Sequence, residues 1–301
     1  MDILRFTLKL KSPLGSEMVS GTLFGQMCWA LREIESEQAL VAWLSDEANL
    51  WGISDGMPFD LLPRPMLAPS PPPTDMEIGE AKKLKKRKFV TRAGFVTTRK
   101  NMTDAGLRKY LADDPSSSTR MAHNTIDRRS GSTPDNAGLY FVDEIWSREE
   151  IWKRDVYIAA PSGNEKRALT LLNHLGEVGF GRDASLGRGV WGIEKVSIDT
   201  ELMVNAGSRR MTLSRGAACD NTMADIRCKL TAHYGKVGPQ IAVAKGISPF
   251  KYPILLTVPG ATFAPIADRR AGQLLKGVHP DRPEIVHNAF HVALSFTEGK
   301  V

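Results

Sequence analysis

The sequence predicts an α+β fold, and three of its features carry that prediction. Apolar and polar side chains alternate over residues 4–11, a period of two that is typical of a strand with one solvated face. Two later segments, 23–34 and 165–176, place apolar residues at helical spacing. Beyond residue 200 the chain consists mainly of short runs that favour strands. Strands and helices mixed in this way indicate an α+β protein.

Both predicted helices have recognisable ends. Ser20 or Thr22 is placed to cap the first helix at its N-terminus. Ser162 and Glu165 form an S-x-x-E capping box in front of the second helix. Gly176 is placed to end that helix, because glycine is the common residue just beyond a helix C-terminus. We therefore expect both segments to be helical.

The order of elements in the first two thirds of the chain is close to that of a ferredoxin-like β-α-β-β-α-β unit. The first strand and helix are followed by a long excursion that begins at the proline-rich stretch 66–75. A strand at 155–160, the second helix, a glycine-rich loop and a strand at 190–198 complete the unit. Within the excursion, 113–119 is expected to be a flexible tip.

The length of 301 residues is enough for two packed domains. We expect one domain at 1–200 and a smaller α+β domain at 201–301, whose last strand lies within 290–296. No stretch approaches the length of a membrane span, and the N-terminal residues do not form a signal peptide.

The three cysteines, Cys28, Cys219 and Cys228, form no CxxC pair. This argues against a disulfide framework and against a cysteine zinc site. His287 and His291 are four residues apart on a predicted strand face, and two ligands are too few for a closed zinc site. We expect a cytoplasmic protein with neither a metal nor another cofactor.

Positive charge is unevenly distributed along the chain. The net charge is +6, and residues 82–100 contain nine Lys or Arg and no Asp or Glu. Such a block favours a polyanionic partner, although a solvated basic loop is an equally good reading. Residues 88–98 resemble a strand, and Phe89 and Phe95 flank it. Their rings would either stack on bases or pack within a hairpin.

The loop after the second helix is rich in glycine, with five glycines in fourteen residues beginning at Gly179. Successive N–H groups in such a loop can form an anion-binding concavity, and Arg182 and Arg188 add phosphate donors. The loop contains a literal GxGxxG, but it follows a helix and opens a strand, which is the wrong context for dinucleotide binding. No GK[ST] is present, so a Walker A loop is excluded. A tight connection that needs glycine for packing remains the alternative.

Several segments resemble the RAMP superfamily of RNA-binding proteins. Residues 179–194 are similar to its glycine-rich loop, GxGxxxSxGxG, and 20–31 to its helix-opening segment. The stretch 122–142, which begins AHNTIDRR, resembles the fourth subunit of the Csm complex of type III-A CRISPR systems. Residues 235–263 and 288–296 are similar to the C-terminal domain of that subunit.

The resemblance implies two ferredoxin-like, RRM-related domains with an inserted β-hairpin thumb, which we place within residues 80–145. It implies a non-catalytic subunit that grips the 5′ handle of the CRISPR RNA (crRNA) and caps the complex. The implied partners are the crRNA, the large Palm-domain subunit and the repeating backbone RAMP subunit, with target RNA contacted only indirectly. The candidate RNA-binding residues are Ser20, Lys86, Arg87, Lys88, Arg92, Phe95, His123, Asn124, Arg128, Arg129, Gly179, Gly181, Arg182, Ser185, Gly187, Arg188, Gly189 and Lys236.

An enzyme is the alternative. His123 lies near Arg128 and Arg129 and has a side chain suited to general base catalysis of RNA cleavage. Asp127 would orient the imidazole only if the segment were helical, and the glycine, serine and proline residues nearby favour a loop. We therefore expect no catalytic residue, and keep a metal-independent endoribonuclease using His123 as the second hypothesis.

Overall fold

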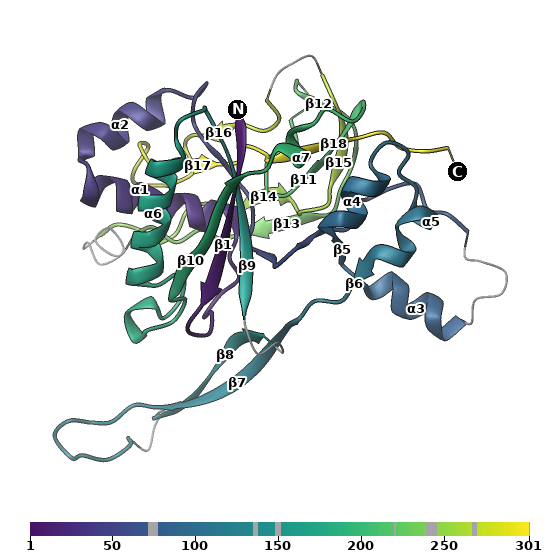
Figure 1. The fold of residues 1–301 in the computed structure, drawn as a ribbon. Coiled ribbons are helices and arrows are strands. Elements are labelled where there is room, and N and C mark those ends of the chain that lie inside the picture. Colours follow the sequence, from purple (N-terminus) through teal and green to yellow (C-terminus); the bar gives the residue numbers. More distant parts are fainter. Residues whose placement is uncertain are drawn as a thin grey trace.

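A computed structural model describes residues 1–71, 78–134, 138–147, 152–219, 221–238, 246–266 and 270–300 (Figure 1). Its largest sheet has the strand order β10-β1-β9-β2, and β3 also pairs with β9. All of these pairings are antiparallel. The strands of this sheet are β1 (Asp2–Leu10), β2 (Gly52–Ile53), β3 (Met57–Pro58), β9 (Lys153–Ala160) and β10 (Trp191–Ile198).

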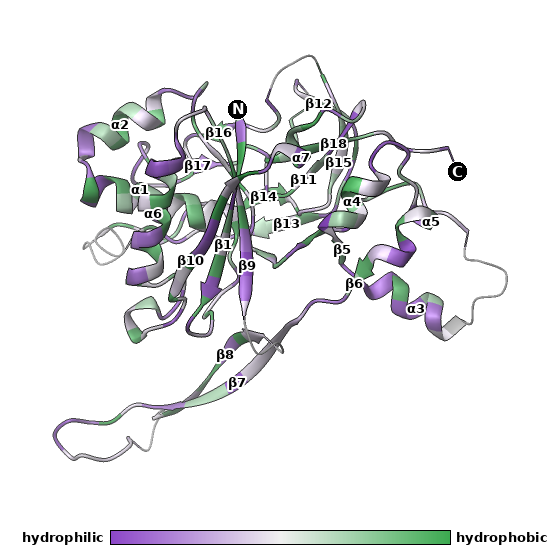
Figure 2. Ribbon diagram, viewed as in Figure 1, coloured by the Kyte–Doolittle hydropathy of each residue, from purple (hydrophilic) through white to green (hydrophobic). Residues whose placement is uncertain are grey.

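Two long helices, α1 (Ser20–Ile34) and α6 (Glu165–Val178), pack on one face of this sheet, and α2 (Glu37–Ser45) packs on α1. Figure 2 shows α1 and α6 banded green and purple, as expected for helices with one buried face. Alternate residues of β1, from Leu4 to Leu10, meet the apolar stripes of the helices in one core. The strand, the two helices and their order are therefore as the sequence predicts.

The ends of the helices differ from the prediction. Ser20 is the first residue of α1 rather than its cap, and the cap residue Val19 makes no side-chain hydrogen bond. Asn164 occupies the N-cap of α6, so the capping box is absent. Gly176 lies inside that helix, where it is packed closely against Trp191. The helix continues to Val178, and Gly179 is its C-cap.

A second sheet has the order β12-β15-β11-β18. With β3, which lies off the main path, left out, both sheets read 4-1-3-2 when their strands are numbered along the chain, which is the order of a ferredoxin-like unit. The described residues between β11 and β18 include no helix. Its strands are β11 (Arg209–Thr212), β12 (Met223–Arg227), β15 (Thr262–Pro265) and β18 (Ala293–Phe296).

Smaller elements surround the second sheet. They are α7 (Thr200–Met203), the paired strands β13 (Leu230–His233) and β14 (Ile254–Thr257), and the paired strands β16 (Leu274–Leu275) and β17 (His287–Asn288). His287 thus lies on β17 and His291 in the segment before β18, rather than both on one strand face. Both are buried, and His291 is a core residue, with Nδ1 2.8 Å from Thr212 Oγ1 and Nε2 2.9 Å from the Ala217 carbonyl.

The excursion between β3 and β9 has two parts (Figure 1). The first part is a three-stranded sheet with short helices. It comprises β4 (Leu61–Pro63), α3 (Ile78–Lys86), β5 (Phe89–Thr91), α4 (Arg92–Thr98), α5 (Asp104–Leu107), a 3-10 turn (Arg108–Tyr110) and β6 (Leu111–Ala112). The second part is a hairpin of β7 (Ser116–Asn124) and β8 (Leu139–Ser147) that projects away from the body. We call residues 116–147 the hairpin.

The hairpin occupies the second half of the range expected for the thumb, residues 80–145, and extends two residues beyond it. Residues 113–119, expected to be a flexible tip, instead lead into β7. Residues 92–98, expected to be strand, form α4, which begins where the Thr91 side chain accepts a hydrogen bond from the Gly94 amide. The helix turns Phe95 into the core, and this burial outweighs the strand preference of the local sequence.

Candidate nucleic-acid interface

The glycine loop, residues 179–190, requires glycine at several positions. Gly179, Gly181, Gly187 and Gly189 all have positive φ, between 67° and 94°. A Cβ on Gly189 would lie 2.4 Å from the Phe180 carbonyl oxygen, so no larger residue fits there. Gly187 has open space around it, and the residues from Ser185 to Gly187 are exposed to solvent. The loop is thus packed at its ends and open at its tip.

Most amides at the ends of the loop are already used by the protein. The Gly189 amide donates to the Pro13 carbonyl at 2.8 Å, and the Val190 amide donates to Ser12 Oγ at 2.9 Å. The Arg182 amide donates to Ser16 Oγ at 3.3 Å. The expected cradle of successive free N–H groups is therefore wrong for these positions, because residues 12–16 accept those hydrogen bonds. We call residues 12–16 the joining segment.

The two arginines of the loop point toward the hairpin. Arg188 Nη2 lies 2.5 Å from Glu144 Oε1, and Arg182 Nη2 donates to the carbonyl of Asp143. The joining segment contacts the same strand, since Leu14 and Ile145 exchange two backbone hydrogen bonds of 3.0 and 2.8 Å. Sequence reasoning treated the loop and the thumb separately and missed the joining segment that unites them.

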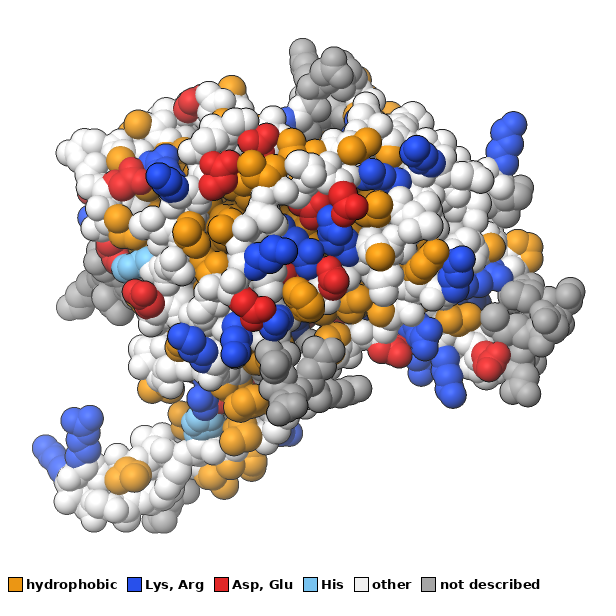
Figure 3. All heavy atoms as spheres, in the orientation of Figure 1, with side chains coloured by type: hydrophobic (Ala, Val, Ile, Leu, Met, Phe, Trp, Pro, Cys, Tyr) orange, Lys and Arg blue, Asp and Glu red, His pale blue; other side chains and the backbone are white. Residues whose placement is uncertain are grey.

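The HNTIDRR segment forms the end of β7 and the hairpin tip. Arg128 and Arg129 are exposed at the tip, where Figure 3 shows Lys or Arg side chains. The Asn124 side-chain amide donates to Thr133 Oγ1 at 2.6 Å, so it holds the tip together. Asp127 accepts a hydrogen bond from the Arg129 amide at 2.8 Å and does not orient His123. The tip thus presents two exposed guanidinium groups on a turn held by hydrogen bonds.

His123 has a carboxylate neighbour that the sequence did not reveal. Its Nε2 lies 4.0 Å from Glu144 Oε1, and its ring stacks on Tyr140 with the centroids 5.4 Å apart. The Nε2 atom is buried and has no hydrogen-bond partner in the described part of the chain. The Nε2 atom is therefore shielded, although the His123 side chain as a whole is 25% exposed.

Exposed aromatic rings lie on β8, where sequence reasoning did not look. Tyr140 is 44% exposed, Phe141 53% and Trp146 40%. Arg120 Cζ lies 4.9 Å from the centroid of the Phe141 ring, so a cation and a ring are paired on the hairpin surface. Figure 3 shows hydrophobic side chains gathered along the hairpin. The repeated aromatic residues from 140 to 146 were the signal available in the sequence.

The basic block lies apart from the hairpin. Its lysines are exposed on α3 and just after it, including Lys86 and Lys88. Arg87 Nε pairs with Asp113 Oδ2 at 3.5 Å, and Arg92 forms ion pairs with Asp199 and Glu201 at 2.6 and 2.7 Å. Figure 1 shows α3 beside β6, whereas the hairpin extends away from that point. The block thus offers free lysines, and its Arg92 is a structural residue.

Two predicted RNA-binding side chains are buried. Phe95 is 0% exposed and cannot stack on a base. Ser20 is 4% exposed, and its hydroxyl donates to the Arg215 carbonyl at 3.2 Å. Lys236, by contrast, is exposed in a bridge with Phe250 after β13. The expectation is therefore wrong for Phe95 and Ser20, whose partners come from distant parts of the chain.

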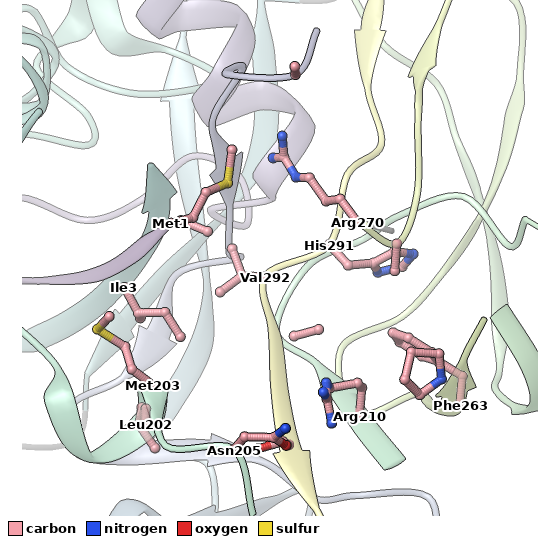
Figure 4. A pocket seen from close by; sticks show the side chains of 16 residues that line it. Met1, Ile3, Leu202, Met203, Asn205, Arg210, Phe263, Arg270, His291 and Val292 are labelled. Atoms are coloured by element: carbon pink, nitrogen blue, oxygen red, sulfur yellow. The ribbon is translucent and has the colours of Figure 1, made fainter. Parts of the chain in front are cut away.

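A pocket of about 540 Å³ lies between the two sheets (Figure 4). Ile3 and Ala159 line it from the first sheet, and Arg210 and Phe263 from the second. Burial lowers the pKa of Arg270, another lining residue, to about 10. None of the residues predicted to bind RNA lines this pocket, so it is separate from the hairpin and the glycine loop.

Other features narrow the chemistry. In the described residues no group of three or more His, Cys, Asp and Glu side chains is placed to hold a metal ion. No disulfide bond joins Cys28, Cys219 and Cys228. None of the helices that the structure describes is long and apolar enough to cross a membrane.

Comparison with known proteins finds likeness in structure only. No family model and no curated protein sequence matches the chain. A Csm1–Csm4 cassette solved with pppApA gives a TM-score of 0.62 at 16% identity, with 100% of each chain covered. A Csm3–Csm4 subcomplex of the type III-A CRISPR-Cas interference complex gives 0.59 at 12% identity, covering 99% of this chain and 100% of that one. A type III-B Cmr-beta complex bound to target RNA gives 0.52 at 12% identity, covering 87% and 86%.

These likenesses show that the chain shares its fold with a chain of the Csm1–Csm4 cassette and of the Csm3–Csm4 subcomplex. Csm4 is the subunit that both of these structures name. The resemblance expected from the sequence is therefore confirmed at the level of the fold.

Proposed function

We propose that the chain is a non-catalytic subunit of a type III-A CRISPR effector complex that binds the 5′ handle of crRNA. The observation that carries this proposal is the hairpin, with exposed aromatic rings on β8 and two arginines at its tip, joined to a glycine loop. In this role the chain caps the complex next to the large Palm-domain subunit, and its second protein partner is the repeating backbone subunit. Target RNA is reached only through the guide.

The chemistry of the hairpin suits single-stranded RNA. Binding of a single strand combines cations along the phosphates with flat rings on which bases stack, and each stacked base contributes about 1–3 kcal/mol. Arg128 and Arg129 supply the cations, and Tyr140 and Phe141 supply rings. The exposed lysines of α3 extend the positive surface.

The domain organisation belongs to the same proposal. Two sheets with the order 4-1-3-2 support two ferredoxin-like units divided near residue 200. The first has helices in both crossovers, and the second has the same strand order with no helix in the described part of its crossovers. A cytoplasmic location agrees with three cysteines that form no disulfide bond.

Salt-dependent binding of crRNA to the reconstituted complex tests the proposal. Arg128→Gln with Arg129→Gln should weaken binding and lower the slope of log affinity against log salt by ~1.4, at about 0.7 per phosphate contact. Arg167→Gln is the matched control, because Arg167 is a partly exposed arginine paired with Glu35 between α6 and α1. An unchanged slope in the double variant would count against RNA binding by the hairpin.

An endoribonuclease remains the second candidate, supported by the Glu144 carboxylate 4.0 Å from His123 Nε2. The burial of that nitrogen argues against it, because a general base must reach the 2′-hydroxyl of RNA. Incubation of the chain with repeat RNA and EDTA separates the two functions. Cleavage that is lost in His123→Ala would establish the enzyme, and intact RNA supports the binding subunit.

A further inference from the structure

Glu144 is a buried carboxylate on an otherwise exposed hairpin. It is 1% exposed, whereas Asp143, the residue before it, is exposed to solvent. Its Oε1 is 2.5 Å from Arg188 Nη2, and its Oε2 has no hydrogen-bond partner in the described part of the chain. Burying a charge is costly unless a partner compensates it, so Arg188 and Glu144 depend on each other.

The pair lies where the hairpin meets the body. The hydrogen bonds and ion pairs that join the two, within the described residues, lie at the hairpin base, at Ser116 and from residue 143 onward. Three consecutive residues take part, through the Asp143 carbonyl, the Glu144 carboxylate and the Ile145 backbone. The glycine loop and the joining segment receive all three contacts.

We infer that Glu144 is a positioning residue, which fixes the direction of the hairpin through its buried ion pair with Arg188. This inference rests on the proposed function for its effect on RNA. Each strand of the hairpin has nine residues, which span about 30 Å at ~3.3 Å per residue. A rotation of roughly 10° at the base therefore moves the tip by about 5 Å, enough to misplace Arg128 and Arg129 relative to a phosphate.

Removing the charge of Glu144 should change RNA affinity in opposite directions if Glu144 positions the hairpin and if charge alone matters. Glu144 carries negative charge close to the proposed path of the RNA, so removing that charge should strengthen RNA binding if charge alone mattered. If Glu144 positions the hairpin, removing the charge should weaken RNA binding instead. Asp143 is the matched control, because its side chain has the same charge one residue away and is exposed.

Two measurements on Glu144→Gln and Asp143→Asn test the inference. The first is the distance distribution between spin labels at Ser130 in the hairpin and Val41 on α2, both exposed, placed through unnatural amino acids so that the native cysteines stay unlabelled. Glu144→Gln should broaden the distribution, and Asp143→Asn should leave it narrow. The second is crRNA affinity, which should fall about tenfold in Glu144→Gln and stay level or rise in Asp143→Asn.

A broadened distance distribution supports the inference whether or not the chain binds RNA. A failure of the inference can therefore be distinguished from a failure of the proposed function. An unchanged distribution, or stronger RNA binding by Glu144→Gln, would overturn it. Arg188→Gln breaks the pair from the other side and should also broaden the distribution. If Glu144→Gln and Arg188→Gln each broaden the distribution, the double variant should broaden it no further than either single variant, because the pair acts as a unit. Additive effects would contradict the pairing.

Discussion

Tyr140 and Phe141 are adjacent on β8 and point to opposite faces of the hairpin, because successive side chains of a strand alternate. On one face Tyr140 stacks with His123, and on the other Arg120 lies over Phe141. Tyr140 and Phe141 are thus each paired with a nitrogen-containing side chain. A base that stacks on Phe141 would keep a cation close to its phosphate.

Phe141→Ala should therefore weaken crRNA binding by about tenfold or more, since one stacked base contributes ~1–3 kcal/mol. The thermal stability of the chain should change little, because the ring is 53% exposed. Phe95→Leu is the contrasting variant. It should cost ~1–3 kcal/mol of stability and leave the RNA affinity of the folded protein unchanged, since Phe95 lies in the core. Equal losses of RNA affinity in Phe141→Ala and Phe95→Leu would show that Phe141 is not a stacking residue.

The two phenylalanines show what sequence could predict at this scale. Phe95 follows a run of lysines and arginines, and no local pattern reveals that Tyr157, Leu294 and other distant residues enclose it. The region of Arg128 and Arg129 was expected to be a loop, because nearby glycine, serine and proline favour a turn, and both arginines are exposed there. The partner of His123 was missed because Glu144 comes from the other strand of the hairpin.

His291 gives the core a defined pH dependence. Burial lowers its pKa to about 4 from an ordinary value of 6.5, and it lies against Thr212 and Ala217 in the neutral form. The unfolded chain takes up a proton below pH 6.5, but the folded chain does so only near pH 4. Stability should therefore fall as the pH drops through this window, by ~2 kcal/mol at pH 5 relative to pH 7 from His291 alone.

Urea unfolding at pH 7 and pH 5 measures this loss. His291→Gln should be less stable at pH 7 but should lose less stability at pH 5, because the titrating group is gone. His287, whose pKa burial lowers to about 3, adds to the slope in both proteins. A pH dependence that is identical in the two proteins would exclude His291 as a source.

At the scale of elements, two positions of the glycine loop need glycine for different physical reasons. Both Gly187 and Gly189 have positive φ, at 81° and 67°. Gly187 has nothing within 4 Å of the Cβ position, whereas Gly189 is against the Phe180 backbone. Backbone strain acts at both positions, and steric exclusion acts only at the second.

Gly187→Ala should therefore cost about 1–2 kcal/mol, the cost of an L-residue in the left-handed region. Gly189→Ala should cost clearly more, because the Phe180 backbone must also move and the hydrogen bond to Pro13 is disturbed. Thermal unfolding of the two variants compares them directly. Equal losses would show that the packing around Gly189 yields easily.

The elements themselves were predictable to different degrees. Strand β1 follows from its period-two pattern, and helices α1 and α6 follow from apolar residues at helical spacing. Strands β9 and β10 were also expected, although β9 is buried on both faces. Helix α4 was predicted as strand, since its seven residues include valine and two threonines and its helical burial depends on distant contacts. The loop was recognised by composition, but its amides turned out to bind the joining segment.

On the scale of the whole molecule, the hairpin is attached to the body at its base. Replacing residues 118–142 by a short Gly-Ser linker keeps Asp143, Glu144 and Ile145 in place. We expect the body to stay folded, with a melting temperature changed by no more than about 2–4 °C, the shift that ~1 kcal/mol produces in a large domain. Binding of crRNA should be lost, and calorimetry with filter binding checks both. Collapse of the body would show that the hairpin supports the core.

Local sequence patterns predicted the strand order of the first sheet but not that of the second. In the first sheet the two helices mark the crossovers, so the ferredoxin-like order was expected. In the second sheet no helix is described between the strands, and only the three-dimensional pairing reveals the same order. Contacts such as Leu14 with Ile145 join residues far apart in the chain and leave no local pattern.

Strands β7 and β8 pair only with each other in the described part of the chain, apart from the bridge at Ile145. Their outer edges leave N–H and C=O groups free next to apolar side chains, which is the template for strand addition between molecules. An isolated preparation should consequently self-associate as its concentration rises, through hairpin edges rather than through the body. Co-expression with the molecules that cover the hairpin should then be the practical route to soluble material.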